Sequence, residues 1–164
     1  MSDVEINLAI SGMPMPVYFI TTVDQNSGKG NIMTGCYLCQ VSENPPMICL
    51  AVAPSRYTHE LIEATGEFAI NGVSQGGEWM EAINCCGTCS GRDVDKFQRI
   101  QLETVSASQI KAPLIKGAYT HLECVVKEKC RAGDHSLFVA QVIAAQTNYQ
   151  RPFIYYYGDV IPLK

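Results

Sequence analysis

Short apolar and β-branched runs, separated by turn-forming residues, make up most of the chain. Residues 17–23 form one such run, and residues 24–30 after it have the composition of a hairpin turn. Residues 47–53 are almost continuously apolar, which predicts a strand covered on both faces. The same reasoning predicts strands at residues 31–42, 68–73, 119–129, 135–145 and 153–157.

The clearest helical pattern follows the run at 47–53. Tyr57, Leu61, Ile62 and Ala64 supply its apolar stripe. Either of two hydroxyl side chains, Ser55 or Thr58, can cap its N-terminus, and Gly66 can end it. Weaker patterns predict a short helix at residues 78–83, a loop at 85–91 and a helical turn at 93–97.

About seven strands, few helices and mostly short connections indicate a mainly β protein, an antiparallel barrel or sandwich. We expect one domain over residues 1–164, because no linker or repeat divides the chain. Neither GxGxxG nor GxxxxGK[ST] occurs, which argues against dinucleotide binding by a Rossmann or P-loop device.

The composition is apolar for its size, with 47% hydrophobic and 17% charged residues. So few charges suggest that an oligomer interface or a bound cofactor hides apolar surface. The net charge of −4, without a basic cluster, argues against nucleic-acid binding. The acidic N-terminus and the short apolar runs predict neither a signal peptide nor a membrane span, so we expect a cytoplasmic protein.

Eight cysteines raise the question of disulfides or metal. In a chain with a core and no export signal, reduced thiols are expected. Cys36 and Cys39 fall in a predicted strand, where a separation of three directs side chains to opposite faces, and no fourth ligand lies near Cys85, Cys86 and Cys89. We therefore expect no metal site. A Cys86–Cys89 pair that relays electrons is the alternative to plain structural thiols.

Three segments carry polar groups suited to a ligand. The turn after residues 47–53 places Ser55, Arg56 and Thr58 at a helix N-terminus, where unpaired N–H groups favour an anion; the alternative is an ordinary N-cap. In the strand after the first hairpin, Gly35 would let a flat ring approach the backbone, or it simply marks a bulge. A turn delivers His135 to the start of another strand, where it is either functional or merely solvated.

Taken in order, these segments resemble the flavin reductase-like family of FMN-binding split barrels, which includes the flavoredoxins. The resemblance runs from about Pro16 to Tyr157. It rests on the short motifs Asn31-Ile32-Met33-Thr34, Ser55-Arg56-Tyr57-Thr58-His59-Glu60-Leu61-Ile62, Phe68-Ala69-Ile70-Asn71 and Gly133-Asp134-His135, with Pro16-Val17, Thr21-Thr22, Val41-Ser42 and Pro45-Pro46. It implies an antiparallel split β-barrel that acts as a homodimer.

The resemblance also implies roles for nine residues. Asn31, Met33, Thr34 and Gly35 would line the flavin; Ser55, Arg56 and Thr58 would hold the phosphate; Lys96 would contact the flavin; and His135 would reach the flavin or a nicotinamide. Cys36-Tyr37 departs from the small residues that many members have there.

The function implied is an NAD(P)H-dependent flavin reductase that transfers hydride to FMN. Two alternatives stay open: a flavoredoxin-like carrier that takes electrons from a redox protein, and a flavin-binding module without turnover.

Overall fold

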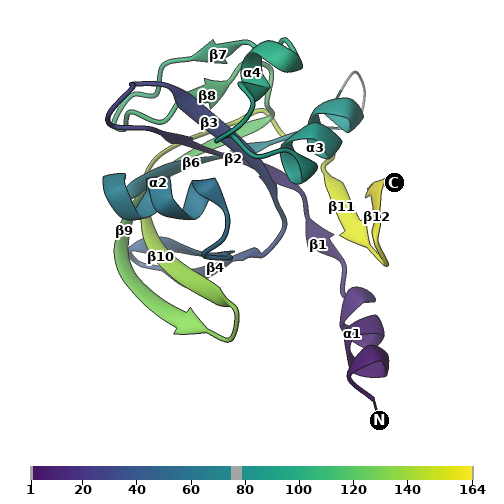
Figure 1. Ribbon diagram of the computed structural model, residues 1–164. Helices are drawn as coiled ribbons and strands as arrows, with labels where there is room; N and C mark the ends of the chain where they lie inside the picture. Colours follow the sequence, from purple (N-terminus) through teal and green to yellow (C-terminus); the bar gives the residue numbers. More distant parts are fainter. Residues whose placement is uncertain (1, 75–78, 164) are drawn as a thin grey trace.

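A seven-stranded antiparallel sheet dominates the computed structural model, which describes residues 2–74 and 79–163 (Figure 1). Its strands are β2 (Tyr18–Val23), β3 (Gly30–Gly35), β4 (Leu38–Glu43), β5 (Pro46–Val52), β6 (Glu67–Gly72), β9 (Thr120–Ala132) and β10 (His135–Thr147). They lie in the order β3-β2-β6-β9-β10-β5-β4. The predicted mainly β, antiparallel architecture with few helices is confirmed.

The two edge strands of this sheet, β3 and β4, are consecutive in the chain and separated only by Cys36 and Tyr37. The sheet must therefore curl until β3 and β4 approach each other. These two strands are not hydrogen-bonded neighbours in the sheet, so the barrel is split between them. The predicted single strand at 31–42 is wrong. The chain turns at the junction, where the Leu38 N–H donates to the Cys36 carbonyl.

Helix α2 (Tyr57–Thr65) packs its apolar side into the barrel. Ile62 joins a buried cluster with Ile20, Phe68 and Phe138, and Leu61 beside it is also buried. Ala64, expected on the stripe, is exposed. Gly66 ends the helix in the left-handed conformation, with φ of 69°, as predicted.

Helix α3 (Trp79–Thr88) covers the outer face of β2 and β3. Phe19 and Ile32 from these strands meet Ile83 of the helix in a second buried cluster. Of the predicted helix at 78–83, Glu78 lies outside the described residues. The predicted loop at 85–91 is wrong in its first half, because α3 continues to Thr88. Near the helical turn predicted at 93–97, the structure has the short helix α4 (Lys96–Arg99).

Strand β5 is not covered on both faces within one chain, contrary to the prediction. Leu50 and Val52 are buried in the barrel. Cys49 and Ala51, which alternate with them, remain half-exposed.

The sequence reading missed several peripheral elements. These are α1 (Asp3–Ser11), β1 (Met15–Pro16), β7 (Thr104–Val105), β8 (Leu114–Ile115) and β12 (Asp159–Pro162), while β11 (Phe153–Tyr156) matches the predicted last strand. Helix α1 begins with a capping box between Ser2 and Glu5 and extends away from the barrel with no buried residue (Figure 1). Across residues 2–74 and 79–163, no helix has the length and apolarity to cross a membrane.

Candidate functional site

A pocket of about 470 Å³ opens where the barrel is split. Its walls come from the end of β3, the β3–β4 junction, the end of β5, the start of α2 and the end of α3. This volume lies in the range of small-molecule sites. The structure brings all nine predicted site residues to this pocket: Asn31, Met33, Thr34, Gly35, Ser55, Arg56, Thr58, Lys96 and His135.

Asn31 lines the pocket and carries an unsatisfied acceptor. The residue is 5% exposed, and its Nδ2 donates to Thr22 Oγ1 at 3.2 Å and to Thr58 Oγ1 at 2.9 Å. The buried Oδ1 atom has no hydrogen-bond partner among the described residues. A buried acceptor without a partner costs about 1–3 kcal/mol.

The residue range 89–91 passes very close to Asn31. A Cβ atom at Gly91 would lie 2.1 Å from Asn31 Oδ1 and 3.2 Å from the Tyr57 ring. Only glycine fits without displacing the buried Asn31 side chain. Sequence reasoning missed Gly91, since its role depends on how closely these segments approach.

The start of α2 forms the polar end of the pocket. Its N-cap is Arg56, and no side chain within residues 2–74 and 79–163 bonds to the first-turn N–H groups. The prediction that Ser55 or Thr58 caps the helix is therefore wrong; the buried Thr58 hydroxyl accepts from Asn31 instead. Uncapped N–H groups beside the exposed Arg56 favour a bound anion.

Lys96 adds a second cation to the pocket wall. The side chain is 5% exposed, and its Nζ donates to the Cys89 carbonyl at 3.3 Å. Burial lowers the pKa of Lys96; the charge of Arg56 lowers it further, while the nearby thiols oppose the shift. A buried ammonium that donates to a neutral carbonyl gains from an anion in the pocket.

Arg92, which the sequence reading did not single out, fastens the 89–92 segment to α2. Its Nη1 donates to the Ser55 carbonyl at 3.1 Å and its Nη2 pairs with Glu60 at 2.9 Å. The guanidinium also lies 5.1 Å from the centroid of the Tyr57 ring. No sequence signal separates this Arg from a solvated one.

His135 stands at the pocket mouth, at the start of β10. Its Nδ1 lies 2.7 Å from Asp134 Oδ1, and this hydrogen bond lowers the pKa of the Asp134 carboxyl. The ring of Tyr37, from the β3–β4 junction, lies 5.5 Å away between centroids. The imidazole is therefore held by two neighbours while its edge remains accessible.

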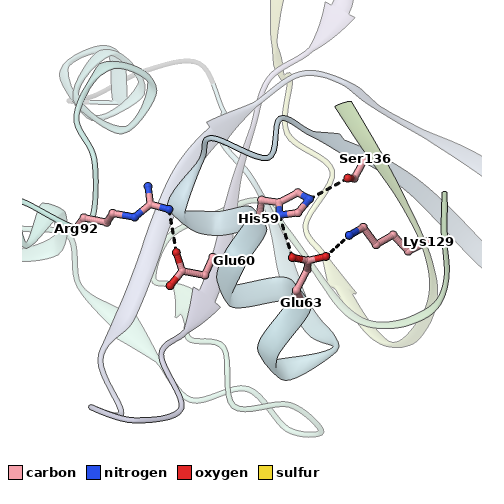
Figure 2. Close-up of polar contacts among 6 residues, drawn as sticks. All are labelled: His59, Glu60, Glu63, Arg92, Lys129 and Ser136. Atoms are coloured by element: carbon pink, nitrogen blue, oxygen red, sulfur yellow. Dashed lines mark hydrogen bonds and ion pairs between the residues drawn. The ribbon is translucent and has the colours of Figure 1, made fainter. Parts of the chain in front are cut away.

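A polar network behind the pocket joins α2 to the β9–β10 hairpin (Figure 2). The buried His59 places Nε2 2.9 Å from Ser136 Oγ and Nδ1 3.4 Å from Glu63, which also pairs with Lys129. Burial lowers the pKa of His59, with the Lys129 charge acting in the same direction and Glu63 against it. Because Ser136 follows His135, the network fixes the two walls of the pocket relative to each other.

The cysteines do not form the Cys86–Cys89 pair that the relay alternative requires. Cys86 is buried in the cluster under α3, and burial raises the pKa of its thiol to about 12. The sulfur of Cys89 instead lies 4.0 Å from that of Cys85, one helical turn earlier. All eight cysteines are free, and within the described part of the chain no cluster of three metal-ligating side chains occurs.

Comparison with known proteins agrees with this architecture. The family model described as "Flavin reductase like domain" matches residues 10–163. An NADH-dependent FAD reductase from Streptomyces globisporus is 29% identical over 126 residues, which cover 77% of this chain and 68% of that protein. An NADH:FAD oxidoreductase of Streptomyces globisporus, solved in complex with NAD and FAD fragments, superimposes with a TM-score of 0.86 at 25% identity, covering 98% of this chain and 92% of that one. A flavoredoxin from Methanosarcina acetivorans superimposes with a TM-score of 0.80 at 29% identity, and the match covers 92% of this chain and 84% of the flavoredoxin.

The fold defines a split-barrel protein, and the polar end of its pocket has the chemistry that suits an anion. The chain belongs to the flavin reductase-like family, since the family model spans nearly all of it.

The network behind the pocket gives a first prediction. Ser136→Ala leaves His59 Nε2 buried without its partner and should lower the free energy of unfolding by about 1–3 kcal/mol in urea titrations. Ser106→Ala, at an exposed position, should change it by less than about 0.5 kcal/mol. The pKa of His59 is lowered, so the folded protein favours the neutral ring. The stabilisation that His59 contributes to folding should therefore be present above pH of about 6.5 and fall as the pH drops further. Equal effects of the two substitutions would show that the network does not hold α2.

Proposed function

We propose that the pocket binds FMN and that the protein is a flavin reductase that accepts hydride from NAD(P)H. The observation that carries this proposal is the convergence of an uncapped helix N-terminus, Arg56 and Lys96 on one pocket. Together these three features suit a phosphate. The names of the NADH-dependent relatives support the same chemistry.

A single phosphate position underlies the choice of FMN in this proposal. The α2 N-terminus and Arg56 offer one place for an anion at the end of the pocket. A neighbouring space of about 390 Å³ carries both signs of charge, with Asp24, Asp93 and Asp95 against Lys29, Arg92 and the shared Lys96. Charges that balance provide no net attraction for a second phosphate.

A bound flavin would supply the hydride acceptor, and the chain's contribution is to place and tune it. In this proposal Arg56 and the α2 amides hold the phosphate. Lys96 stabilises negative charge inside the pocket, because its ammonium is buried and screened less by water. His135, oriented by Asp134 and Tyr37, positions the incoming nicotinamide at the mouth.

A second function is supported by the 29% identity to a flavoredoxin over 92% of this chain. In that function the protein would take electrons from a redox protein and need no nicotinamide.

The third possibility, a flavin-binding module without turnover, has no observation in its favour.

Arg56→Ala tests where the phosphate lies. A hydrogen bond to a charged group contributes about 1.5–3 kcal/mol, so FMN affinity should fall roughly ten- to hundredfold. Riboflavin, which lacks the phosphate, should bind both proteins equally. Fluorescence titrations with FMN, riboflavin and FAD measure this, with Arg151→Ala as the exposed control. An equal loss for FMN and riboflavin would place the phosphate elsewhere, and tighter binding of FAD than of FMN would contradict the assignment of the ligand.

Anaerobic addition of NADH or NADPH to the FMN-loaded protein separates the two functions. The reductase should bleach within seconds of mixing, and His135→Ala should bleach more slowly while its FMN affinity stays near that of the wild type. Colour that persists until dithionite or a reduced ferredoxin is added would favour the electron carrier.

We also propose that the protein is a homodimer. Cys49 and Ala51 on β5, together with Val41 on β4, leave an apolar sheet face uncovered, and the chain has few charges to solvate it. Light scattering of the FMN-loaded protein at micromolar concentration should give twice the mass of the 18.0 kDa chain. A monomer under these conditions would contradict the proposal.

A further inference from the structure

Two thiols lie in contact at the end of α3, on the wall of the pocket. Cys85 Sγ and Cys89 Sγ are 4.0 Å apart, and both side chains are partly exposed. Cys89 lines the pocket, whereas Cys85 does not. Burial and the hydrogen bond to Cys89 both raise the pKa of the Cys85 thiol.

The position of the pair at a helix end makes closure feasible. A disulfide needs an S–S distance of about 2.05 Å and Cβ atoms about 3.5–4.5 Å apart. Residues four apart in a helix have Cβ atoms about 5–6 Å apart, so the last turn must move. Cys89 is the first residue after α3, and its N–H bond to the Cys85 carbonyl at 2.9 Å closes that turn. Only this terminal turn has to rearrange.

Movement of Cys89 acts directly on the cationic wall. Its carbonyl accepts from Lys96 Nζ at 3.3 Å, and its sulfur lies 3.7 Å from Arg99 Nη1. Two residues later, Gly91 packs against Asn31 with no room for a side chain. A shift of this segment therefore changes the surroundings of Lys96 and Asn31 together.

We propose that Cys85 and Cys89 form a reversible disulfide by exchange with a low-molecular-weight disulfide, and that its closure weakens binding in the pocket. In the first exchange, Cys89 loses its proton, its sulfur bonds to one sulfur of the small disulfide, and the other leaves as a thiolate that takes up that proton. In the second, the deprotonated Cys85 sulfur attacks Cys89 Sγ and releases the second small thiol, which takes the proton from Cys85. Two electrons pass from the cysteine pair to the small disulfide. Arg99 stabilises negative charge that develops on the Cys89 sulfur during exchange.

The chemical part of this proposal is tested without any ligand. FMN-free protein is equilibrated with oxidised glutathione, its remaining thiols are alkylated, and its peptides are mapped by mass. We expect an intramolecular Cys85–Cys89 disulfide that dithiothreitol reverses. Cys39 and Cys49, which face each other on β4 and β5, provide an internal comparison. A disulfide at Cys39–Cys49 instead, or mixed disulfides alone, would overturn the proposal.

The coupling to the pocket rests on the proposed function and is measured separately. Oxidation should raise the Kd for FMN about tenfold. Because coupling between sites is reciprocal, saturating FMN should raise by the same factor the concentration of oxidised glutathione needed for half-oxidation at a fixed concentration of reduced glutathione. An unchanged Kd in the oxidised protein would overturn the coupling. A protein that forms the disulfide but binds no FMN when reduced would contradict the proposed function and still support the thiol pair.

Matched variants isolate the pair. Cys85→Ser, outside the pocket lining, should bind FMN like the reduced wild type and keep that affinity after oxidation; Cys85→Ala replaces it if the serine variant does not fold. Cys130→Ser removes an exposed thiol near the C-terminal end of β9, outside the pocket lining, and should retain the full response. A response that survives in the Cys85 variants would overturn the assignment to this pair.

Discussion

The short connection between β3 and β4 is the constraint on which the rest of the molecule depends. Two residues, Cys36 and Tyr37, join strands that stand at opposite edges of a seven-stranded sheet. The sheet can satisfy this connection only by curling, and its inner face then becomes a barrel core into which α2 packs. Because β3 and β4 do not pair with each other, a gap remains between these edges. The pocket lies in that gap, bordered by the ends of β3 and β5 and the start of α2.

Polar interactions, rather than apolar packing alone, set the geometry of the pocket. Asn31 links β3 to Thr58 on α2, and Arg92 fastens the 89–92 segment to Ser55 and Glu60. His59 joins α2 to the strand that carries His135 (Figure 2). Each wall is thus tied to α2, and the first turn of this helix is the fixed point of the site.

Much of this arrangement could be predicted from the sequence because it depends on local patterns. The strands at 17–23 and 135–145 show the composition of buried or half-buried sheet, and Gly66 is an unambiguous helix end. All nine proposed site residues lie on one pocket, and it is the family resemblance of their motifs that singles them out, since the local patterns alone also allow an ordinary N-cap, a bulge and a solvated His135. Gly91, Arg92 and the Cys85–Cys89 contact depend on how distant or neighbouring turns meet in space, which no local pattern records. The helix at 79–88 was cut short because cysteine, glycine and threonine are weak helix formers.

The close approach of Gly91 to Asn31 also determines how the interior space is divided. Two cavities meet at this boundary, which Gly91 lines together with Asn31, Tyr57 and Lys96. A side chain added at Gly91 would displace Asn31, and glycine has none to withdraw. At Gly91 the width of the partition is therefore set by the path of the backbone, and a substitution that widens the passage has to act at one of the three neighbouring side chains.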